Sequence, residues 1–270
     1  MTTAPSIAII GGSGLYRLFE SDAETQTVAT PYGSVEVTVG ELSGKRVAFF
    51  PRHGVDHSVA PHLIDARANL WAVASLGVRV VLTTAAVGGI HPDYPSGTLA
   101  IPDQFIDRTW GRPDTYYDHG SVQHLQAADP FDRALREVAM GALADDHIVP
   151  RATVVVVQGP RFSTRAESRW FAAAGAHLVN MTLYPEIVLA AELNLGYLNL
   201  SFVTDADAGD DAVEGDDDVS AELVFARLAD AQPRIRAALA AIVAAIPDDY
   251  RPATRIADAE VAAVLARPTS

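Results

Sequence analysis

The chain has 270 residues, of which 49% are hydrophobic and 20% are charged, a balance typical of a globular protein with a large buried core. Its formal net charge of −14 argues against a nucleic-acid polymer as partner, because phosphate backbones are bound by a surplus of Lys and Arg. There is no cysteine, which excludes disulfides, thiolate metal ligands and a cysteine nucleophile and is compatible with the cytoplasmic location that we expect.

Short apolar runs typical of strands begin at residues 7, 35, 46, 78, 153, 177 and 197. Several of them are apolar throughout, as in strands that are covered on both faces of a sheet. Helical patterns lie between them: one over 62–77, one after Pro130, and a long one that starts from a Ser220 cap and is expected to kink or divide at Pro233. This alternation predicts an α/β fold with a central mixed β-sheet flanked by helices.

No linker, repeat or shift in composition divides the chain, so we expect a single domain over residues 1–247. Residues 248–270 form a C-terminal tail that we expect to be loosely attached and to contain a short helix. No apolar run approaches the roughly 20 residues that span a bilayer, and the N-terminus lacks the pattern of a signal peptide, so no membrane association is expected. The acidic segment 205–219 stands out, and we interpret its distal part as a solvated loop.

The run IAIIGGSGLY, residues 7–16, has the form of a strand followed by a glycine-rich, anion-binding loop. A dinucleotide fingerprint needs a third small residue where this chain has Arg17, and a triphosphate-binding loop needs a Gly-Lys-Ser/Thr sequence that does not follow here. Two interpretations remain. The backbone N–H groups and the Ser13 hydroxyl hold one small anion, or the turn needs only the conformational freedom of glycine.

Arg52 and His53 follow the strand-like run that begins at residue 46. A guanidinium fork beside a titratable imidazole donor is suited to clamping an anion. The spacing of four between His53 and His57 also occurs in zinc-binding helices, but no Glu follows His53. Because Pro51 and Gly54 also oppose a helix, we expect no metal site here.

Three more strand-like runs end in groups that can contact a ligand. The run from residue 78 ends in the small residues 85–88, where a ligand can touch the backbone. The run from 177 is followed by Asn180 and Thr182, and the run from 197 presents Asp205 and Asp207 on one side of the strand. Because open α/β sheets bind ligands at the carboxyl ends of their strands, these groups predict one pocket at that edge.

The segments IIGGSGLY, PRHG, TAAVGG, DQFIDRT, QGPRFSTRAESR, NMTLYPE and VTDAD occur in this order between residues 6 and 245. Together they resemble the 5′-methylthioadenosine phosphorylase branch of the trimeric purine nucleoside phosphorylase family, for which GPRFSTRAESR with NMT…PE is highly specific. The resemblance implies an enzyme that uses inorganic phosphate as co-substrate, and no cofactor, to cleave the N-glycosidic bond of a purine nucleoside. The products are the free purine and a pentose 1-phosphate.

The resemblance also assigns site residues by motif position. The residues implied to hold the phosphate are Ser13, Arg52, His53, Ala85, Ala86 and Thr182. The residues implied to contact the nucleoside are His57, Val87, Gly88, His124, Phe162, Ser163, Asn180, Met181, Asp205 and Asp207.

The catalytic role falls to the two aspartates in this resemblance. Asp205 matches the family acid that faces N7 of the purine, which must leave protonated, and Asp207 is expected to accept a hydrogen bond from the adenine 6-amino group. Donation near neutral pH requires a raised pKa for Asp205, which burial and the neighbouring Asp207 both favour. The related 6-oxopurine branch has Asn at the Asp205 position and Glu at the Ser163 position, so we expect this chain to prefer 6-aminopurines.

His124 matches a family histidine that reaches the 5′ pocket of a neighbouring subunit, which implies a homotrimer. Three functions remain open. The first is a methylthioadenosine phosphorylase of purine and methionine salvage. The second is a phosphorylase of another 5′-modified adenosine or of 6-oxopurine nucleosides, and the third is a non-catalytic nucleoside-binding protein that kept the fold.

Overall fold

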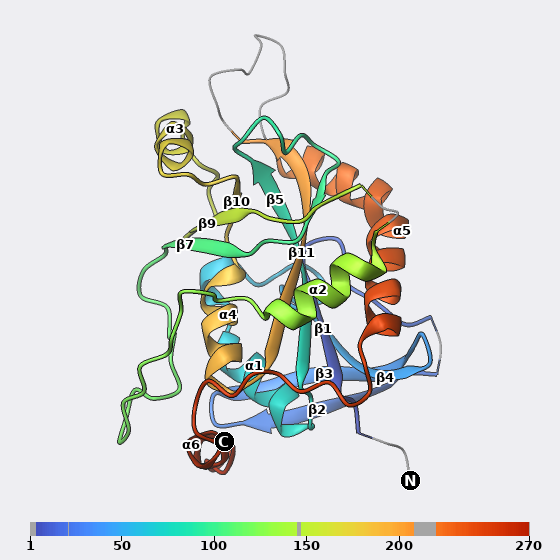
Figure 1. Ribbon diagram of the computed structural model, residues 1–270, viewed down its shortest axis with the longest axis vertical. Helices are drawn as coiled ribbons and strands as arrows, with labels where there is room; N and C mark the ends of the chain where they lie inside the picture. Colours follow the sequence, from blue (N-terminus) through green and yellow to red (C-terminus); the bar gives the residue numbers. More distant parts are fainter. Residues whose placement is uncertain (1–3, 21, 145–146, 208–219, 270) are drawn as a thin grey trace.

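The computed structural model describes residues 4–20, 22–144, 147–207 and 220–269. Within these residues the predicted α/β architecture is confirmed: one mixed sheet is flanked by helices (Figure 1). The strands are β1 Ile7–Gly11, β2 Glu24–Thr30, β3 Gly33–Leu42, β4 Lys45–Pro51, β5 Val80–Gly89, β6 Leu99–Ala100, β7 Gln104–Arg108, β8 Ile148–Val149, β9 Thr153–Val157, β10 Leu178–Asn180 and β11 Gly196–Ala206. The helices are α1 Ala66–Ser75, α2 Arg133–Ala142, α3 Arg165–Ala173, α4 Leu183–Glu192, α5 Ala221–Ala245 and α6 Asp258–Leu265, with a 3-10 turn at Pro61–Leu63.

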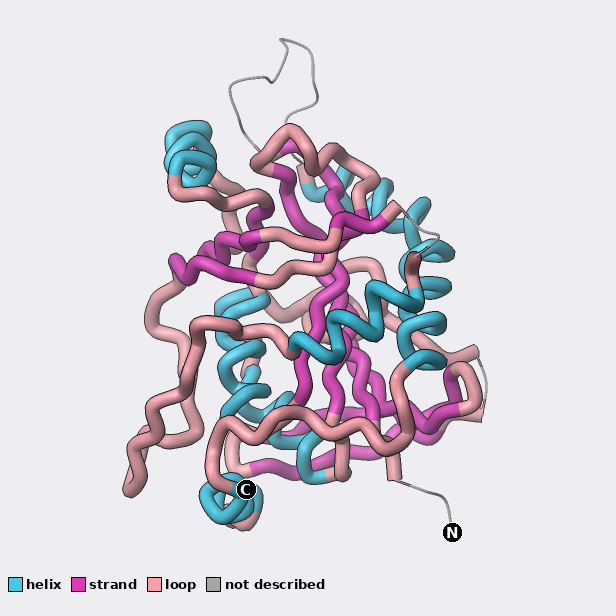
Figure 2. Tube along the Cα trace, in the orientation of Figure 1, coloured by secondary structure: helices cyan, strands magenta, loops and turns pink. Residues whose placement is uncertain are grey.

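The sheet is organised around β5, which lies with the long strand β11 at the centre of the molecule (Figure 2). β5 pairs in parallel with β11 along its length and with β1 over Val80–Thr83. Its last residues, Gly88 and Gly89, pair with β10, which runs antiparallel to it. The strand order is β2-β3-β4-β1-β5-β10-β9-β7, with β11 and the short β6 and β8 attached at the side of β5.

Different helices cover the two faces of this sheet. α1 and α4 pack on one face, with α6 against α1, and α2 and α5 pack on the other (Figure 1). Side chains alternate between the faces along β5: Val81 and Val87 belong to the first core, and Val80 and Leu82 to the second. Both faces are therefore apolar, which is why the predicted strand is a continuous apolar run.

The helix predicted over 62–77 begins later than its apolar spacing indicates. Ile64 is extended, and the Asp65 side chain accepts a hydrogen bond from the backbone N–H of Ala68 at 2.9 Å. With Asp65 as its N-cap, α1 begins at Ala66, four residues after the predicted beginning. The capping carboxylate satisfies a backbone N–H that has no partner within the helix, and this fixes the start of the helix.

The long C-terminal helix starts at the predicted cap, where the Ser220 hydroxyl accepts a hydrogen bond from the backbone N–H of Leu223. Of the kink or division expected at Pro233, the division does not occur, since α5 continues as one helix from Ala221 to Ala245. Proline removes one backbone donor, and packing of Ile235, Leu239 and other residues of α5 in the core keeps the helix together.

Several elements have no apolar signature in the sequence. Strand β2, with the sequence ETQTVAT, is mostly exposed and lies at the edge of the sheet, paired only with β3 among the described strands. An edge strand is stabilised by its backbone hydrogen bonds on one side and needs few buried side chains. Helix α3 is likewise mostly exposed and starts with a capping box formed by Thr164 and Glu167.

The expectation of a loosely attached C-terminal tail is wrong. Val261 and Val264 of α6 are buried, and the indole N–H of Trp71 in α1 donates to the Val264 carbonyl at 3.1 Å. Arg267 donates to the Tyr116 carbonyl at 2.6 Å. Hydrophobic burial and these hydrogen bonds fix the segment to the body of the protein.

The acidic segment lies outside the described residues from position 208 to 219. Across the residues that are described, no helix is both long and apolar enough to cross a membrane.

The attachment of α6 can be tested by a charge placed under it. We expect Val264→Asp to lower the free energy of unfolding by about 2–4 kcal/mol, because it buries an unpaired carboxylate at a position that is 2% exposed. The control Ala263→Asp lies on the exposed side of the same helix and should change stability by about 0.5 kcal/mol or less. Urea unfolding followed by circular dichroism measures both, and equal midpoints for the two variants would show that α6 is not docked.

Candidate active site

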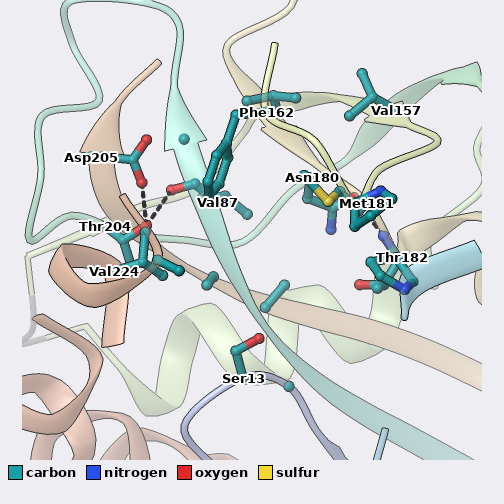
Figure 3. A pocket seen from close by; sticks show the side chains of 18 of the residues that line it. Ser13, Val87, Val157, Phe162, Asn180, Met181, Thr182, Thr204, Asp205 and Val224 are labelled. Atoms are coloured by element: carbon teal, nitrogen blue, oxygen red, sulfur yellow. Dashed lines mark hydrogen bonds between the residues drawn. The ribbon is translucent and has the colours of Figure 1, made fainter. Parts of the chain in front are cut away.

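A cavity of about 310 Å³ opens where β1, β4, β5, β10 and β11 end, beside the first turn of α5 (Figure 3). This volume lies at the lower end of the range for small-molecule sites. Every site residue predicted from the sequence lines it, with the exception of His124. These residues are Ser13, Arg52, His53, His57, Ala85, Ala86, Val87, Gly88, Phe162, Ser163, Asn180, Met181, Thr182, Asp205 and Asp207.

The strands whose carboxyl ends bring these groups together run in two directions, which the predicted mixed sheet allows. β1, β4, β5 and β11 are mutually parallel, but β10 runs antiparallel to β5. Val179 pairs with Gly88, so the next residue, Asn180, lies at the cavity beside the last residues of β5, on a strand that runs in the opposite direction. The site therefore lies where parallel strands of the sheet meet an antiparallel one.

The glycine-rich loop after β1 forms one end of the cavity. The N–H of Gly12 donates to the Thr84 hydroxyl at 2.9 Å, and a Cβ on Gly12 would lie 2.3 Å from the Thr84 carbonyl oxygen. Glycine is thus required here by close approach to β5. The same packing holds Ser13 at the cavity, where its hydroxyl points inward (Figure 3).

Arg52 lies beside this loop and forms a buried ion pair that the sequence analysis did not assign. Its Nε donates to one carboxylate oxygen of Glu186 at 2.5 Å and its Nη2 to the other at 2.9 Å. Nη1 donates to the Thr84 carbonyl oxygen at 2.9 Å. The side chains of both partners are 1% exposed. The bidentate face of the guanidinium is therefore occupied by Glu186, and the other N–H groups of Nη1 and Nη2 are left for a ligand.

A chain of buried hydrogen bonds supports Glu186 from the sheet. The Tyr197 hydroxyl donates to Glu186 at 3.0 Å and receives a hydrogen bond from Thr83 at 3.1 Å. Asn199 donates to Thr83 at 2.8 Å, and Ser201 donates to Asn199 at 2.6 Å. The network connects α4 to β5 and β11, and burial of the Tyr197 hydroxyl raises its pKa well above the usual value, so it stays a donor.

His53 has its Nδ1 at 2.9 Å from the Val59 carbonyl oxygen. A carbonyl oxygen can only accept, so Nδ1 carries the proton of this hydrogen bond. Burial, opposed by that hydrogen bond and assisted by the charge of Arg52 and by the neighbouring His57, lowers the pKa of His53 to about 4. The imidazole is therefore neutral at pH 7, and the titratable donor expected from the sequence is directed at the protein backbone.

The aspartates lie at the other end of the cavity, on β11 and just beyond it. A β-bulge at Thr204 shifts the register of β11 against β5, so that Asp205 lies opposite Gly88. The Thr204 hydroxyl lies 2.5 Å from Asp205 Oδ1 and 3.3 Å from the Val87 carbonyl oxygen (Figure 3). A Cβ on Gly88 would be 3.0 Å from Val179 and 3.3 Å from the Asp205 carboxylate, so glycine leaves the room in which the carboxylate lies.

Both carboxylates are buried, at 6% exposure for Asp205 and 8% for Asp207. Burial is the main cause of a raised pKa of Asp205, and the negative charge of Asp207 adds to it, while Thr204 and Arg227 oppose the shift. The direction and both causes agree with the sequence analysis. The Ser168 hydroxyl, from α3, donates to Asp207 Oδ2 at 2.5 Å and so fixes the second carboxylate.

Arg112 is a residue that the sequence analysis missed. Its guanidinium donates to the backbone carbonyls of Met181 at 2.9 Å, Tyr184 at 2.7 Å and Gln158 at 2.9 Å. These carbonyls belong to the segment after β10 and the segment after β9, which both contribute walls of the cavity. Its Nε also donates to the side-chain oxygen of Gln158 at 3.2 Å. No spacing in the sequence indicates this role, because the partners lie 46 to 72 residues further along the chain.

The side of the cavity formed by α5 is apolar. Val224 and Phe225 line it, and the Phe225 ring stands edge-on to His57 with ring centroids 5.2 Å apart. Burial lowers the pKa of His57. Near the opposite wall, Ser163 Oγ and Asn180 Nδ2 are buried and have no hydrogen-bond partner among the described residues. Polar atoms of this kind in a cavity wall are available to a ligand.

His124 is the predicted site residue that the structure does not bring to the cavity. It is exposed in the segment between β7 and α2 and is not among the residues that line the cavity. Part of the segment between β7 and α2 projects from the body of the protein in Figure 1, and Trp110 and Val122 in it are 69% and 76% exposed. Tyr116 and Phe131 of the same segment are buried in the core.

Comparison with known proteins adds a family context to this geometry. A family model described as "Phosphorylase superfamily" matches residues 6–246. An S-methyl-5′-thioadenosine phosphorylase of Mycolicibacterium smegmatis is 53% identical over 205 residues, covering 75% of this chain and 78% of that protein. A purine nucleoside phosphorylase of Streptomyces coelicolor is 47% identical over 253 residues, or 89% of each chain. A structure of methylthioadenosine phosphorylase from Schistosoma mansoni in complex with adenine is similar with a TM-score of 0.85, 29% identity and 96% coverage of each chain.

The buried ion pair allows a matched pair of substitutions. We expect Glu186→Gln to lower the free energy of unfolding by about 3–5 kcal/mol, because it leaves the buried Arg52 without a counter-charge. The control Glu167→Gln removes the carboxylate that Arg161 binds at 2.7 Å on the surface, and it should cost about 1 kcal/mol or less. Chemical unfolding measures both variants, and equal losses would contradict a supporting role of the buried pair.

Proposed function

The chain belongs to the phosphorylase superfamily, and we propose that it cleaves 5′-methylthioadenosine with inorganic phosphate to adenine and 5-methylthioribose 1-phosphate. The adenine and the phosphorylated pentose are products that salvage reactions can use. Phosphate is a co-substrate in this proposal, and no cofactor is required. A cytoplasmic location, compatible with the absence of cysteine, belongs to the same proposal.

One observation carries this proposal. A single cavity has hydroxyl and guanidinium groups at one end and a buried aspartate with a raised pKa at the other. Anion donors at one end suit a phosphate, and a protonated carboxyl at the other suits a leaving group that must be protonated. A sensor of nucleosides needs neither of the two ends, so this arrangement favours catalysis over binding alone.

In the proposed mechanism the phosphate binds between Ser13, Arg52, His53 and Thr182, with backbone contacts at Ala85 and Ala86. As the bond between C1′ and the purine breaks, positive charge builds on the sugar, and the phosphate below it stabilises that charge and then attacks C1′. The purine leaves with the bonding electron pair and takes a proton at N7 from the Asp205 carboxyl. Met181 lies along the sugar, and Asp207, held by Ser168, accepts from the 6-amino group.

The choice of base depends on Asp205 and Ser163. A glutamate in place of Ser163 would accept the N1–H of hypoxanthine or guanine, which adenine lacks, and the serine cannot supply that carboxylate. A buried polar mismatch costs about 1–3 kcal/mol, so two such positions give a preference of about 100-fold or more for 6-aminopurines. The relative from Streptomyces coelicolor, a purine nucleoside phosphorylase by name, keeps phosphorolysis of 6-oxopurine nucleosides as the second candidate.

The 5′ substituent is assigned from the apolar side of the cavity. Val224, Phe225 and the neutral ring of His57 suit a methylthio group, because such a group gains by burial against apolar side chains. A hydroxyl in the same place would lose water without gaining a described partner on α5. This favours methylthioadenosine over adenosine.

A homotrimer is part of this proposal. His124 is exposed and does not line the cavity of its own subunit, as expected for a residue that reaches a neighbouring site. Exposed apolar side chains near it, such as Val122, are typical of a surface that another protein covers.

The acid can be tested by Asp205→Asn. We expect kcat for methylthioadenosine to fall by about 10²–10⁴-fold while the affinity for phosphate stays close to that of the wild type, since Asn cannot donate the proton. The wild-type kcat should be highest where Asp205 is protonated and should fall as the pH rises through its raised pKa, a fall that the variant lacks. Steady-state kinetics over pH measures this, and equal losses of kcat and phosphate affinity would indicate a structural role.

The substrate can be assigned by phosphate-dependent release of base from methylthioadenosine, adenosine, 5′-deoxyadenosine and inosine. We expect kcat/KM to be highest for methylthioadenosine and about 100-fold or more lower for inosine. Preference for inosine would overturn the roles of Ser163 and Asp205 and support the second candidate. If no nucleoside reacts with phosphate, the protein is a binding protein.

A further inference from the structure

The phosphate end of the cavity has little positive charge. The ionisable residues described along the cavity are Arg52, His53, His57, Asp205 and Asp207. The single fully charged cation among them, Arg52, is paired with Glu186 over 2.5–2.9 Å. A pair of opposite charges at this distance has almost no net field beyond its dipole. The phosphate end of the cavity therefore offers hydrogen-bond donors to an anion but no positive charge that is not already paired.

The tautomer of His53 also leaves this end of the cavity without a hydrogen-bond donor at Nε2. Because Nδ1 donates to the Val59 carbonyl oxygen, the neutral ring has its lone pair on Nε2. Nε2 can accept a hydrogen bond from a ligand but cannot donate one. A phosphate oxygen without a proton would face that lone pair with no hydrogen between them, which is unfavourable.

The charged and titratable groups around His53 keep the ring neutral in the free site. Arg52 precedes it, and His57 stacks at a ring-centroid distance of 4.6 Å with its Nδ1 at 3.2 Å from the Tyr16 hydroxyl. Asp56, in the same loop, is exposed to solvent. Burial and the charge of Arg52 lower the pKa of His53, and no described carboxylate forms an ion pair with it to oppose them.

We infer that this site binds inorganic phosphate together with one proton more than the free dianion HPO₄²⁻ carries, and that this proton lies between a phosphate oxygen and Nε2 of His53. The inference rests on the proposed use of phosphate. Free HPO₄²⁻ and a proton from solution become either H₂PO₄⁻ donating to neutral His53 or HPO₄²⁻ accepting from the imidazolium. The same atoms and charges are present in both forms, and only an O–H or an N–H bond is exchanged.

This arrangement explains why a buried histidine is placed in a phosphate cage. The bound anion supplies the negative charge that the free site lacks near Nε2, so it stabilises a proton at a position where the empty site does not. Phosphate binding and proton uptake are consequently linked, and affinity for phosphate should fall about tenfold per pH unit where the dianion predominates in solution.

Titration calorimetry of phosphate into the full-length protein, without nucleoside, tests this at about pH 8 in buffers of different ionisation enthalpy. We expect the observed enthalpy to vary with that of the buffer with a slope of about one proton taken up. The variant His53→Asn, which has no titratable ring, should bind phosphate without that proton. His57→Asn and Asp205→Asn serve as matched controls and should keep the uptake.

Phosphate binding without proton uptake by the wild type would overturn the inference. So would uptake that persists in His53→Asn and is lost in His57→Asn or Asp205→Asn. Thermal unfolding of each variant shows that it is folded, and the pH dependence of the wild-type affinity tests the linkage without any substitution. The calorimetry contains no nucleoside, so a result against proton uptake does not contradict the proposed phosphorolysis. A negative substrate assay contradicts the phosphorolysis but not the linkage between phosphate binding and proton uptake.

Discussion

The buried ion pair of Arg52 and Glu186 is the constraint on which this site depends. The arginine follows β4 and the glutamate lies on α4, so the pair fixes a helix from late in the chain against a loop from early in it. Neither charge could be buried alone, because the loss of hydration would cost several kcal/mol. Each charge is tolerated only because the other lies within hydrogen-bonding distance. Hydrogen bonds from Tyr197 to Glu186 and from Thr83 to Tyr197 connect the pair to the centre of the sheet.

Burial acts in the same chemical direction at both ends of the cavity. It lowers the pKa of His53 and raises the pKa of Asp205, and so favours the uncharged form of each group. At the acid end this favours the protonated carboxyl that the proposed leaving purine requires. At the phosphate end burial leaves Nε2 of His53 as a hydrogen-bond acceptor and not as a cation. The inferred extra proton therefore has to bind together with the phosphate. Burial within one cavity thus sets the protonation of both groups.

Much of the fold and many of the cavity-lining residues could be predicted because their signals are local. Continuous apolar runs mark strands that are buried on both faces, and small or polar groups at their ends mark the place where they meet. The edge strand β2 and the start of α1 at Asp65 could not be predicted in this way, since backbone pairing and a side-chain cap decide them. Ser168 and Arg112 were missed because their partners are far apart in the sequence.

The sequence by itself determined the alternation of strands and helices, the family resemblance, and the residue types that line the cavity. Only the tertiary structure decided what each group can do. It directs the Arg52 fork at Glu186, points the Nδ1–H of His53 at the Val59 carbonyl oxygen and aligns Asp205 with Gly88 through the bulge at Thr204. The physical reason is that charge, protonation and hydrogen-bond direction depend on distances and burial, which arise from contacts between residues that the chain order does not place together.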